Sequence, residues 1–486
     1  MSTSTKNSLP PKFDFDLLVI GCGPAGQRAA VQAAKLKKRV AIVDKREVVG
    51  GVCVNTGTVP SKSFREAVLF LSGFRQRHIY GSGYKVKSDI EMGDLTFRCD
   101  RLVQTEIEVI KNQLSRNNVE LIQGHARFVD GHTLEITSAT GGVTKKSAER
   151  IVIAVGAKPV RIPKAAVDGK MIFDSENILS LRKIPRSMVV VGAGVLGTEY
   201  GSIFGALGVH VTLVDKLKKP LGFLDEDIIE NLHYQLRGGG LTLRFGEEAS
   251  ACRVDGDSVL VDIKGGKVIE ADCALFAIGR QSATEDLGLD RIGIEPTSRG
   301  KIAINEHQQT AMSSVYAAGD VVGFPALASV AAMQGRRAAR HAFGADVEGP
   351  DYPCPYGLYS IPEISHVGLT EKEAAKDKIP YEIGVARYRE ITHGHILGDE
   401  SGMLKLLFRQ DTRKLLGVHV IGELATEIVH LGQAVLAHGG SIDYLANAVF
   451  NYPTLSECYK VAALDGINKL KRAKEATPSG VAGKGV

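Results

Sequence analysis

The chain has 486 residues, and 44% of them are apolar, so it is long enough to form the cores of two to four ordinary domains. Its net charge of +5 is mild, and no basic block is interleaved with aromatic residues, so we expect no nucleic-acid partner. No apolar run reaches the ~18 residues of a transmembrane helix, and the N-terminus lacks the apolar segment of a signal peptide, so we expect a cytoplasmic protein.

Two stretches of the sequence repeat one pattern. Residues 15–26 (FDLLVIGCGPAG) lead to RVAIVD at 39–44, and residues 188–197 (MVVVGAGVLG) lead to HVTLVD at 210–215. Each reads as a buried strand, a GxGxxG turn, a helix and a second strand that ends in an acid. The first glycine lies 23 residues before the acid in both, from 21 to 44 and from 192 to 215. GxGxxG alone is a weak signal, but this complete order is typical of dinucleotide-binding units.

Each residue type in the pattern has a physical role. The glycines allow a tight turn and bring backbone N–H groups against a pyrophosphate, and the helix N-terminus adds about half a positive charge there. The acid accepts a hydrogen bond from a ribose hydroxyl. Two such units in one chain predict two bound dinucleotides.

The stretch GGVCVNTGTVPSK at 50–62 is a loop of small residues that leads into a helix following Pro60. It looks suited to a pair of redox thiols, yet only Cys53 is a thiol, and Thr58 stands five positions later. The other six cysteines are scattered, without a CxxC pair or metal-ligand spacing. We therefore expect reduced thiols packed in the fold, and no metal site.

The remaining elements indicate several domains. Residues 149–163 and 271–289 each read as a buried strand that crosses between domains, and residues 313–343 read as a strand, a Gly-Asp pair and a helix that begins near Ala326. From about residue 350 the pattern changes to that of a separate α+β domain. Its clearest elements are strands at 402–410 and 414–422 and a helix at 425–439.

Several motifs together resemble the flavoprotein disulfide reductase family, which includes lipoamide dehydrogenase and glutathione reductase. They are the two fingerprints, the loop at 50–62, AVGAKP at 154–159, VYAAGDV at 315–321 and NYPTLSE at 451–457. The resemblance covers residues 14–470. Within this family the chain is most similar to a group of soluble, Si-specific transhydrogenases. That group also has Thr at the position of Thr58, and NYPT where disulfide reductases have His-Pro-Thr.

The resemblance implies an α/β fold with two Rossmann-like domains, for FAD and NAD(P), and a C-terminal α+β dimerisation domain. It implies that FAD is a bound cofactor and that NAD and NADP are substrates. It also implies a homodimer, or a higher assembly. The boundaries that we assign are a disordered N-terminus at 1–12, an FAD domain at 13–160 and 286–348, an NAD(P) domain at 161–285, a dimerisation domain at 349–471 and a disordered tail at 472–486.

The resemblance also implies the site residues. Those at FAD would be Gly21, Gly23, Gly26, Asp44, Lys45, Arg46, Gly50, Gly51, Val52, Cys53, Lys62, Gly156, Asp320 and Ala328. Those at NAD(P) would be Gly192, Gly194, Gly197, Glu199, Asp215, Lys216 and Gly279.

Two departures from the family remove its thiol chemistry. Cys53 matches the outer, substrate-facing cysteine, but Thr58 replaces the cysteine nearest the flavin, so no intrachain disulfide can form there. Tyr452 replaces the histidine base, although Glu457 remains five residues later. A phenol with a pKa of about 10, against about 6.5 for imidazole, is a poor proton acceptor at neutral pH. Cys53 is either a reactive thiol beside the flavin or a small residue kept for packing, and the two departures lead us to favour the packing residue.

Lys62 is expected in the first turn of the helix after Pro60. By resemblance it reaches the N5 edge of the flavin and pairs with Glu199. A fixed ammonium stabilises the negative charge that develops when hydride adds there. Alternatively, Lys62 is a surface lysine without a role in the reaction.

Asp215 suits the free 2′-hydroxyl of NAD, whereas Lys216, Lys218 and Lys219 directly after it could hold the 2′-phosphate of NADP or could form a solvated loop. We predict an enzyme that moves hydride between NADPH and NAD⁺ through FAD in a ping-pong mechanism. Two alternatives stay open: an NAD(P)H-dependent quinone or dye reductase, and an idle flavoprotein that serves as a binding subunit of a larger complex.

Overall fold

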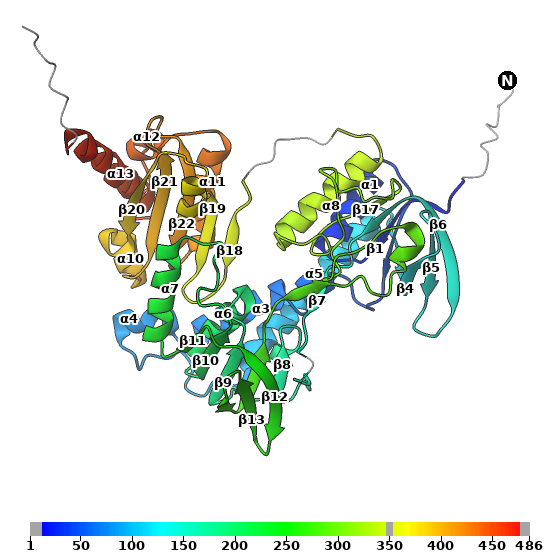
Figure 1. Ribbon diagram of the computed structural model, residues 1–486, viewed down its shortest axis with the longest axis horizontal. Helices are drawn as coiled ribbons and strands as arrows, with labels where there is room; N and C mark the ends of the chain where they lie inside the picture. Colours follow the sequence, from blue (N-terminus) through cyan, green and yellow to red (C-terminus); the bar gives the residue numbers. More distant parts are fainter. Residues whose placement is uncertain (1–11, 163, 347–352, 477–486) are drawn as a thin grey trace, which may run out of the picture. The chain divides into compact units, whose positions relative to one another are not determined.

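The computed structural model describes residues 12–162, 164–346 and 353–476 (Figure 1). The chain divides into two compact units. The first unit comprises Met1–Ser63, Thr96–Val160 and Gly279–Gly349. The second comprises Phe64–Leu95, Arg161–Ile278 and Pro350–Val486. Of the two ends expected to be disordered, residues 1–11 and 477–486 lie outside the described residues, while the last helix continues to Ala476, past the expected boundary at 471.

The first unit is built on a sheet with the strand order β3-β2-β1-β6-β5-β4, in which β17 also pairs with β6. Five strands run parallel to one another, as the repeated strand–turn–helix pattern predicts: β3, β2, β1, β6 and β17. Strand β5 is antiparallel to both of its neighbours, β4 and β6. The bounds are β1 (Phe15–Ile20), β2 (Val40–Asp44), β3 (Glu120–Gln123), β4 (His125–Phe128), β5 (Thr133–Thr137), β6 (Val143–Ile153) and β17 (Val315–Ala317).

Strand β1 is buried on both faces of this sheet. Leu17 and Val19 belong to one apolar cluster, which includes residues of α1 (Pro24–Lys35), α5 (Met92–Arg116) and α8 (Ala328–Ala342), while Leu18 and Ile20 belong to a second cluster. Helices α1 and α8 approach so closely that a Cβ at Gly335 would lie 2.0 Å from the Ala25 carbonyl oxygen. The helix predicted near Ala326 is α8, and it begins at Ala328.

The loop at 50–62 contains two helices, α2 (Gly51–Asn55) and α3 (Thr58–Leu71). The prediction that the helix follows Pro60 was wrong, because α3 starts at Thr58 and takes Pro60 into its first turn, where a missing N–H removes no helical hydrogen bond. Lys62 is therefore the fifth residue of α3 and begins its second turn. A short antiparallel ribbon of β7 (Ala157–Pro159) and β16 (Arg280–Ser282) completes this unit.

The second unit contains a parallel sheet with the order β11-β10-β9-β15-β8. Helices α6 (Val195–Ala206) and α7 (Glu226–Gly238) contact it, and β12, β13 and β14 form a separate antiparallel sheet. The strand bounds are β8 (Ile172–Asp174), β9 (Ser187–Val191), β10 (His210–Asp215), β11 (Thr242–Phe245), β12 (Ala249–Asp255), β13 (Ser258–Ile263), β14 (Lys267–Ala271) and β15 (Cys273–Phe276).

The C-terminal part of the second unit is an antiparallel sheet with the order β18-β19-β22-β21-β20 and flanking helices. The strands predicted at 402–410 and 414–422 are β21 and β22, and the helix predicted at 425–439 is α11. Bounds are β18 (Tyr356–Leu358), β19 (Ile364–Gly368), β20 (Tyr381–Arg387), β21 (Met403–Arg409), β22 (Leu415–Ile421), α9 (Glu371–Lys376), α10 (Thr392–Leu397), α11 (Ala425–Ala437), α12 (Ile442–Asn447) and α13 (Glu457–Ala476). The short helix α4 (Arg77–Tyr80) belongs to the segment Phe64–Leu95 of the second unit.

The predicted fold class is confirmed, because two Rossmann-like sheets, one mixed and one parallel, and a C-terminal α+β domain are present. In the part of the chain that the structure describes, no helix combines the length and apolar character needed to cross a membrane.

Candidate dinucleotide-binding sites

The two glycine-rich turns have the same geometry. Gly21 and Gly192 adopt φ angles of +103° and +101°, which favour glycine. A Cβ at Gly26 would lie 1.9 Å from the Gly21 carbonyl oxygen, and a Cβ at Gly197 would lie 1.7 Å from that of Gly192. The third glycine of each motif therefore lets its helix pack directly on the turn.

The middle glycines, Gly23 and Gly194, have a different function. Each is the N-cap of the following helix, α1 or α6, and neither helix has a side-chain cap. A Cβ built at either glycine meets no atom within 4 Å. The N-terminal amides of both helices thus adjoin open space, which is the arrangement that accepts an anionic pyrophosphate.

The two acids at the strand ends are also equivalent. Asp44 accepts hydrogen bonds from the backbone N–H groups of Cys22 at 2.6 Å and Arg46 at 2.8 Å. Asp215 accepts them from Ala193 at 2.6 Å and Leu217 at 2.7 Å. Each carboxylate is therefore fixed beside its glycine-rich turn, where it can accept a ribose hydroxyl.

The loop that follows Asp44 returns to the first turn. Gly50 donates its N–H to the Cys22 carbonyl oxygen at 3.0 Å, and a Cβ at Gly51 would lie 2.9 Å from the Cα of Gly23. Gly50 and Gly51 have φ angles of +103° and +61°. The start of α2 is therefore built against the fingerprint. Along this loop Lys45 is exposed, whereas Arg46 and Val52 are half-buried.

Cys53 lies in α2 near the N-terminus of α3. Burial raises the pKa of its thiol, and a hydrogen bond with the Thr58 side chain opposes the shift in pKa only in part. None of the seven cysteines forms a disulfide. The Cys53 thiol is therefore protonated at neutral pH, which makes it a weak nucleophile.

Four further predicted residues lie in the first unit. Asp320 follows β17, and burial raises its pKa although Arg280 opposes the shift. Gly156 follows β6 with a φ of +70°, and its carbonyl oxygen accepts the Ala283 N–H at 3.1 Å. Gly279, which we assigned to the NAD(P) site, has a φ of +115° and also lies in the first unit, whereas Gly192 lies in the second. Ala328 is the first residue of α8.

Lys62 and Glu199 belong to different units. Lys62 is half-buried on α3, while Glu199 is 2% exposed on α6 and accepts the Tyr359 N–H at 2.8 Å. Their pairing stays a prediction.

Tyr452 and Glu457 have separate hydrogen-bond partners. The Tyr452 side chain is 70% exposed and its hydroxyl forms a 2.8 Å hydrogen bond with Thr392. Glu457 starts α13 and accepts the Thr454 N–H at 3.4 Å. The structure therefore does not join the two side chains as a base and its partner.

The loop after Asp215 contains several charged side chains, and some of them form ion pairs. Lys219 pairs with Glu226, and Arg244 of the neighbouring strand pairs with Glu247 at 2.8 Å. Within the described chain Lys216 and Lys218 form no ion pair, and both side chains are exposed.

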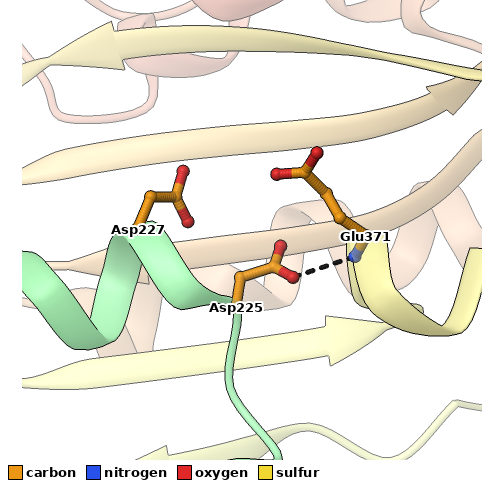
Figure 2. A group of neighbouring side chains, drawn as sticks. All are labelled: Asp225, Asp227 and Glu371. Atoms are coloured by element: carbon orange, nitrogen blue, oxygen red, sulfur yellow. Dashed lines mark hydrogen bonds between the residues drawn. The ribbon is translucent and has the colours of Figure 1, made fainter. Parts of the chain in front are cut away.

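Sequence reasoning missed a buried ionic cluster in the second unit. The carboxylates of Asp225, Asp227 and Glu371 converge, with oxygen atoms within 4.8 Å of one another (Figure 2). The ammonium of Lys405, a fully buried residue, lies 3.1 Å from Asp225, 2.9 Å from Asp227 and in contact with Glu371. Lys405 thus supplies the positive charge that a metal ion would otherwise supply. The only local sign of this cluster in the sequence is Lys405 itself, a single lysine inside the apolar strand MLKLLFR.

Comparisons with known proteins agree on one family. The model of the pyridine nucleotide-disulphide oxidoreductases matches residues 15–335, and the model of their dimerisation domain matches residues 354–463. The soluble pyridine nucleotide transhydrogenase of Mycobacterium tuberculosis is 50% identical over 459 residues, which are 94% of this chain and 98% of that protein. The protein of the same name from Escherichia coli is 39% identical over 466 residues, which are 95% and 100%. The crystal structure of LpdA from M. tuberculosis has a TM-score of 0.85 at 28% identity and covers 92% of this chain and 99% of that one.

Proposed function

Because the chain belongs to the pyridine nucleotide-disulphide oxidoreductase family, we propose that it is a flavin-dependent transhydrogenase that moves hydride between NADPH and NAD⁺ in either direction. The observation that carries this proposal is Thr58, which stands beside Cys53 where a disulfide reductase needs a second thiol. Without that thiol, and with Tyr452 bonded to Thr392 in place of a histidine base, the remaining redox chemistry is that of a flavin and a nicotinamide.

The first unit fits FAD. The turn at Gly21 and Gly26 has no room for side chains, and the open N-terminus of α1 would bind the pyrophosphate. Asp44, already oriented by the amides of Cys22 and Arg46, would accept a ribose hydroxyl. Bound FAD would supply the chemistry, because its ring can accept a hydride from one nicotinamide and return it to another.

The protein's own groups would orient the reactants and stabilise charge. The Lys62 ammonium would stabilise negative charge at the ring edge. The fingerprint at Gly192–Gly197, with Asp215, would bind each nucleotide in turn, so that one leaves before the other arrives. Lys216 and Lys218 would hold the 2′-phosphate of NADPH, whereas Asp215 would hold the free ribose of NAD⁺.

Further parts of the proposal follow from the family. We assign FAD binding to residues 13–160 and 286–348, NAD(P) binding to 161–285 and dimerisation to 349–471. We also propose a cytoplasmic homodimer and Si-specific hydride transfer. Transfer of the label from NADPH deuterated at one or the other face of C4 tests the stereochemistry, and gel filtration tests the dimer.

The activity test uses the purified holoprotein with NADPH and thio-NAD⁺, whose reduction is followed by absorbance, and compares turnover with that on a quinone. Faster turnover on thio-NAD⁺ supports the transhydrogenase. A quinone turnover that exceeds it would make the protein a quinone reductase, and no turnover with either acceptor would leave a binding subunit.

A further inference from the structure

The residue that follows the third glycine of each fingerprint reaches back to the same atom of its own turn. In the second unit, the Thr198 hydroxyl donates to the Ala193 carbonyl oxygen at 3.2 Å. In the first unit, the Gln27 side-chain amide donates to the Cys22 carbonyl oxygen at 2.8 Å. Ala193 and Cys22 each follow the first glycine of their motif, so the two contacts are equivalent.

Both donors are enclosed by the protein, since Thr198 is 2% exposed and Gln27 is 8% exposed. A threonine inside a helix ordinarily turns its hydroxyl to a carbonyl oxygen three or four residues before it. Thr198 instead reaches five residues back, past the N-cap Gly194 of α6, to the turn that precedes the helix. Its hydroxyl therefore bonds the turn and not only its own helix.

This contact fixes the second of the two peptides that flank Ala193. The first is held by Asp215, which accepts the Ala193 N–H at 2.6 Å. The second peptide carries the Ala193 carbonyl and the Gly194 N–H, and in a planar trans peptide these two groups point in opposite directions. Because its carbonyl oxygen is turned toward Thr198, this peptide directs the Gly194 N–H to the other side of the turn.

The orientation of this N–H matters at the start of a helix. A Cβ built at Gly194 meets no atom within 4 Å, and the N-terminus of α6 favours a negative charge in that open space. If the peptide could rotate, it would have to be ordered when an anion binds, and this ordering would weaken the binding. A donor on the Ala193 carbonyl oxygen orders the peptide beforehand.

The first unit supports a role beyond packing. A buried hydroxyl needs an acceptor in any protein, so the Thr198 contact taken alone would also fit a structural role. Gln27 has a different shape and a different donor group, yet it bonds the equivalent carbonyl oxygen. The feature that the two turns share is thus the hydrogen bond and not the side chain that makes it.

We propose that Thr198 is a positioning residue for the nicotinamide nucleotide. Its hydroxyl holds the Ala193–Gly194 peptide so that the Gly194 N–H faces the pyrophosphate, and it acts through the backbone without contact with the reacting atoms. This inference concerns the second unit alone. It rests on the proposed function, because it takes the fingerprint at Gly192–Gly197 as the site of NAD(P).

The test measures binding to the oxidised, FAD-loaded enzyme by calorimetric titration, which requires no turnover. Its ligands are ADP-ribose, which contains the pyrophosphate, and adenosine, which does not. Thr198→Val keeps the shape of the side chain but removes the donor, so the Kd for ADP-ribose should rise by about 3- to 10-fold, while the Kd for adenosine changes by less than about twofold. Thr198→Ser keeps the hydroxyl and should bind ADP-ribose like the wild type.

Steady-state kinetics supply a second readout. In Thr198→Val the KM for NADPH should rise while kcat stays within about twofold, because the change affects binding and not the chemical step. The control variant is Ser250→Ala, which removes another hydroxyl that donates to a backbone carbonyl, that of Asp262 at 3.2 Å, in the separate antiparallel sheet of the second unit. It should leave the Kd for ADP-ribose and the KM for NADPH unchanged.

Two results would overturn the proposal. One is a Thr198→Val variant that binds ADP-ribose as tightly as the wild type. The other is an equal loss of ADP-ribose and adenosine binding, which would indicate general damage to the site. A wild type that binds ADP-ribose but does not pass hydride to NAD⁺ would overturn only the proposed function, because the comparison of the two ligands does not depend on the reaction.

Discussion

The carboxylate of Asp215 accepts the backbone N–H of Ala193 at 2.6 Å and so ties the end of β10 to the second glycine-rich turn. Asp44 holds Cys22 at the same distance in the first unit. One local arrangement therefore occurs twice, and the two acids should differ only in the dinucleotide that each one serves.

Replacing Asp215 tests this assignment. Asp215→Asn removes a charged acceptor for the ribose hydroxyl, so the KM for NAD⁺ should rise about 10-fold or more, while the KM for NADPH changes less. Steady-state kinetics with each nucleotide measure both values. The matched variant Asp44→Asn should instead lower the FAD content of the purified protein. An unchanged KM for NAD⁺ in Asp215→Asn would place the ribose elsewhere.

Lys62 tests the electrostatic part of the mechanism. Lys62→Met removes a fixed cation, so reduction of the bound flavin by NADPH should slow by about 100-fold or more. Stopped-flow absorbance measures the rate, and Lys111→Met, at an exposed position on α5, is the control. A Lys62→Met variant that binds FAD and reacts at the wild-type rate would show that Lys62 does not act at the ring.

The residue beside Cys53 tests the loss of the thiol relay. Because α2 and α3 bring Thr58 within hydrogen-bond reach of Cys53, Thr58→Cys should form a disulfide under air, and dithionite should then deliver about four electrons per FAD in place of two. The control variant Thr58→Ser, which adds no thiol, should still take up about two electrons per FAD. The disulfide variant should remain a poor disulfide reductase until Tyr452 is also replaced by His.

The protonation of the Cys53 thiol can be followed through the pH dependence of its alkylation rate. Burial raises its pKa, so the thiolate forms only above the usual range for cysteine. Alkylation of Cys53 by iodoacetamide, followed by mass spectrometry, should be slow at pH 7 and should accelerate at a higher pH than the alkylation of free cysteine in solution. Rapid alkylation of Cys53 at neutral pH would identify a reactive thiol instead of a packing residue.

The cluster around Lys405 should stabilise the second unit. Lys405→Met leaves three neighbouring carboxylates without their cation, so the free energy of unfolding should fall by about 3–5 kcal/mol. Lys469→Met, at a half-exposed pair with Asp465, should cost about 1 kcal/mol or less. Urea unfolding measures both changes, and an equal, small loss in the two variants would contradict the prediction.

The same cluster predicts a dependence of stability on pH. Burial alone would lower the pKa of Lys405, but Glu371 and Asp227 outweigh it and raise the pKa to about 12 from 10.5. A raised pKa stabilises the fold while the unfolded lysine is still protonated, so this contribution is complete below about pH 10. It is lost as the pH rises toward 12, so the difference in stability between the wild type and Lys405→Met should become smaller there.

The sequence predicts the parts of this protein that depend on neighbouring residues. The order of strand, glycines, helix and acid locates both fingerprints, because each role is filled within some 25 residues of chain. The alternating and apolar runs of β21, β22 and α11 are equally local. The start of α3 was misplaced because Pro60 resembles a helix boundary, although proline is tolerated inside the first turn.

Contacts between distant residues could not be predicted. Arg65 meets Ser360 across 295 positions, and Lys405 meets Asp227 across 178. Nothing near either residue in the sequence indicates its partner, since such pairs depend on how separate elements pack. Both are buried charges, and the lysine inside an apolar strand was the one local sign that a counter-ion must come from elsewhere.

The central claim is that hydride passes through the flavin without any thiol. The most direct test is an anaerobic mixture of Cys53→Ser holoprotein with one equivalent of NADPH, followed by NAD⁺, with the flavin absorbance recorded throughout. The claim predicts that NADPH bleaches the flavin band and that NAD⁺ restores it, with one NADH formed per flavin at rates close to the wild type. A variant that binds FAD but cannot be bleached by NADPH, or stays bleached when NAD⁺ is added, would contradict it.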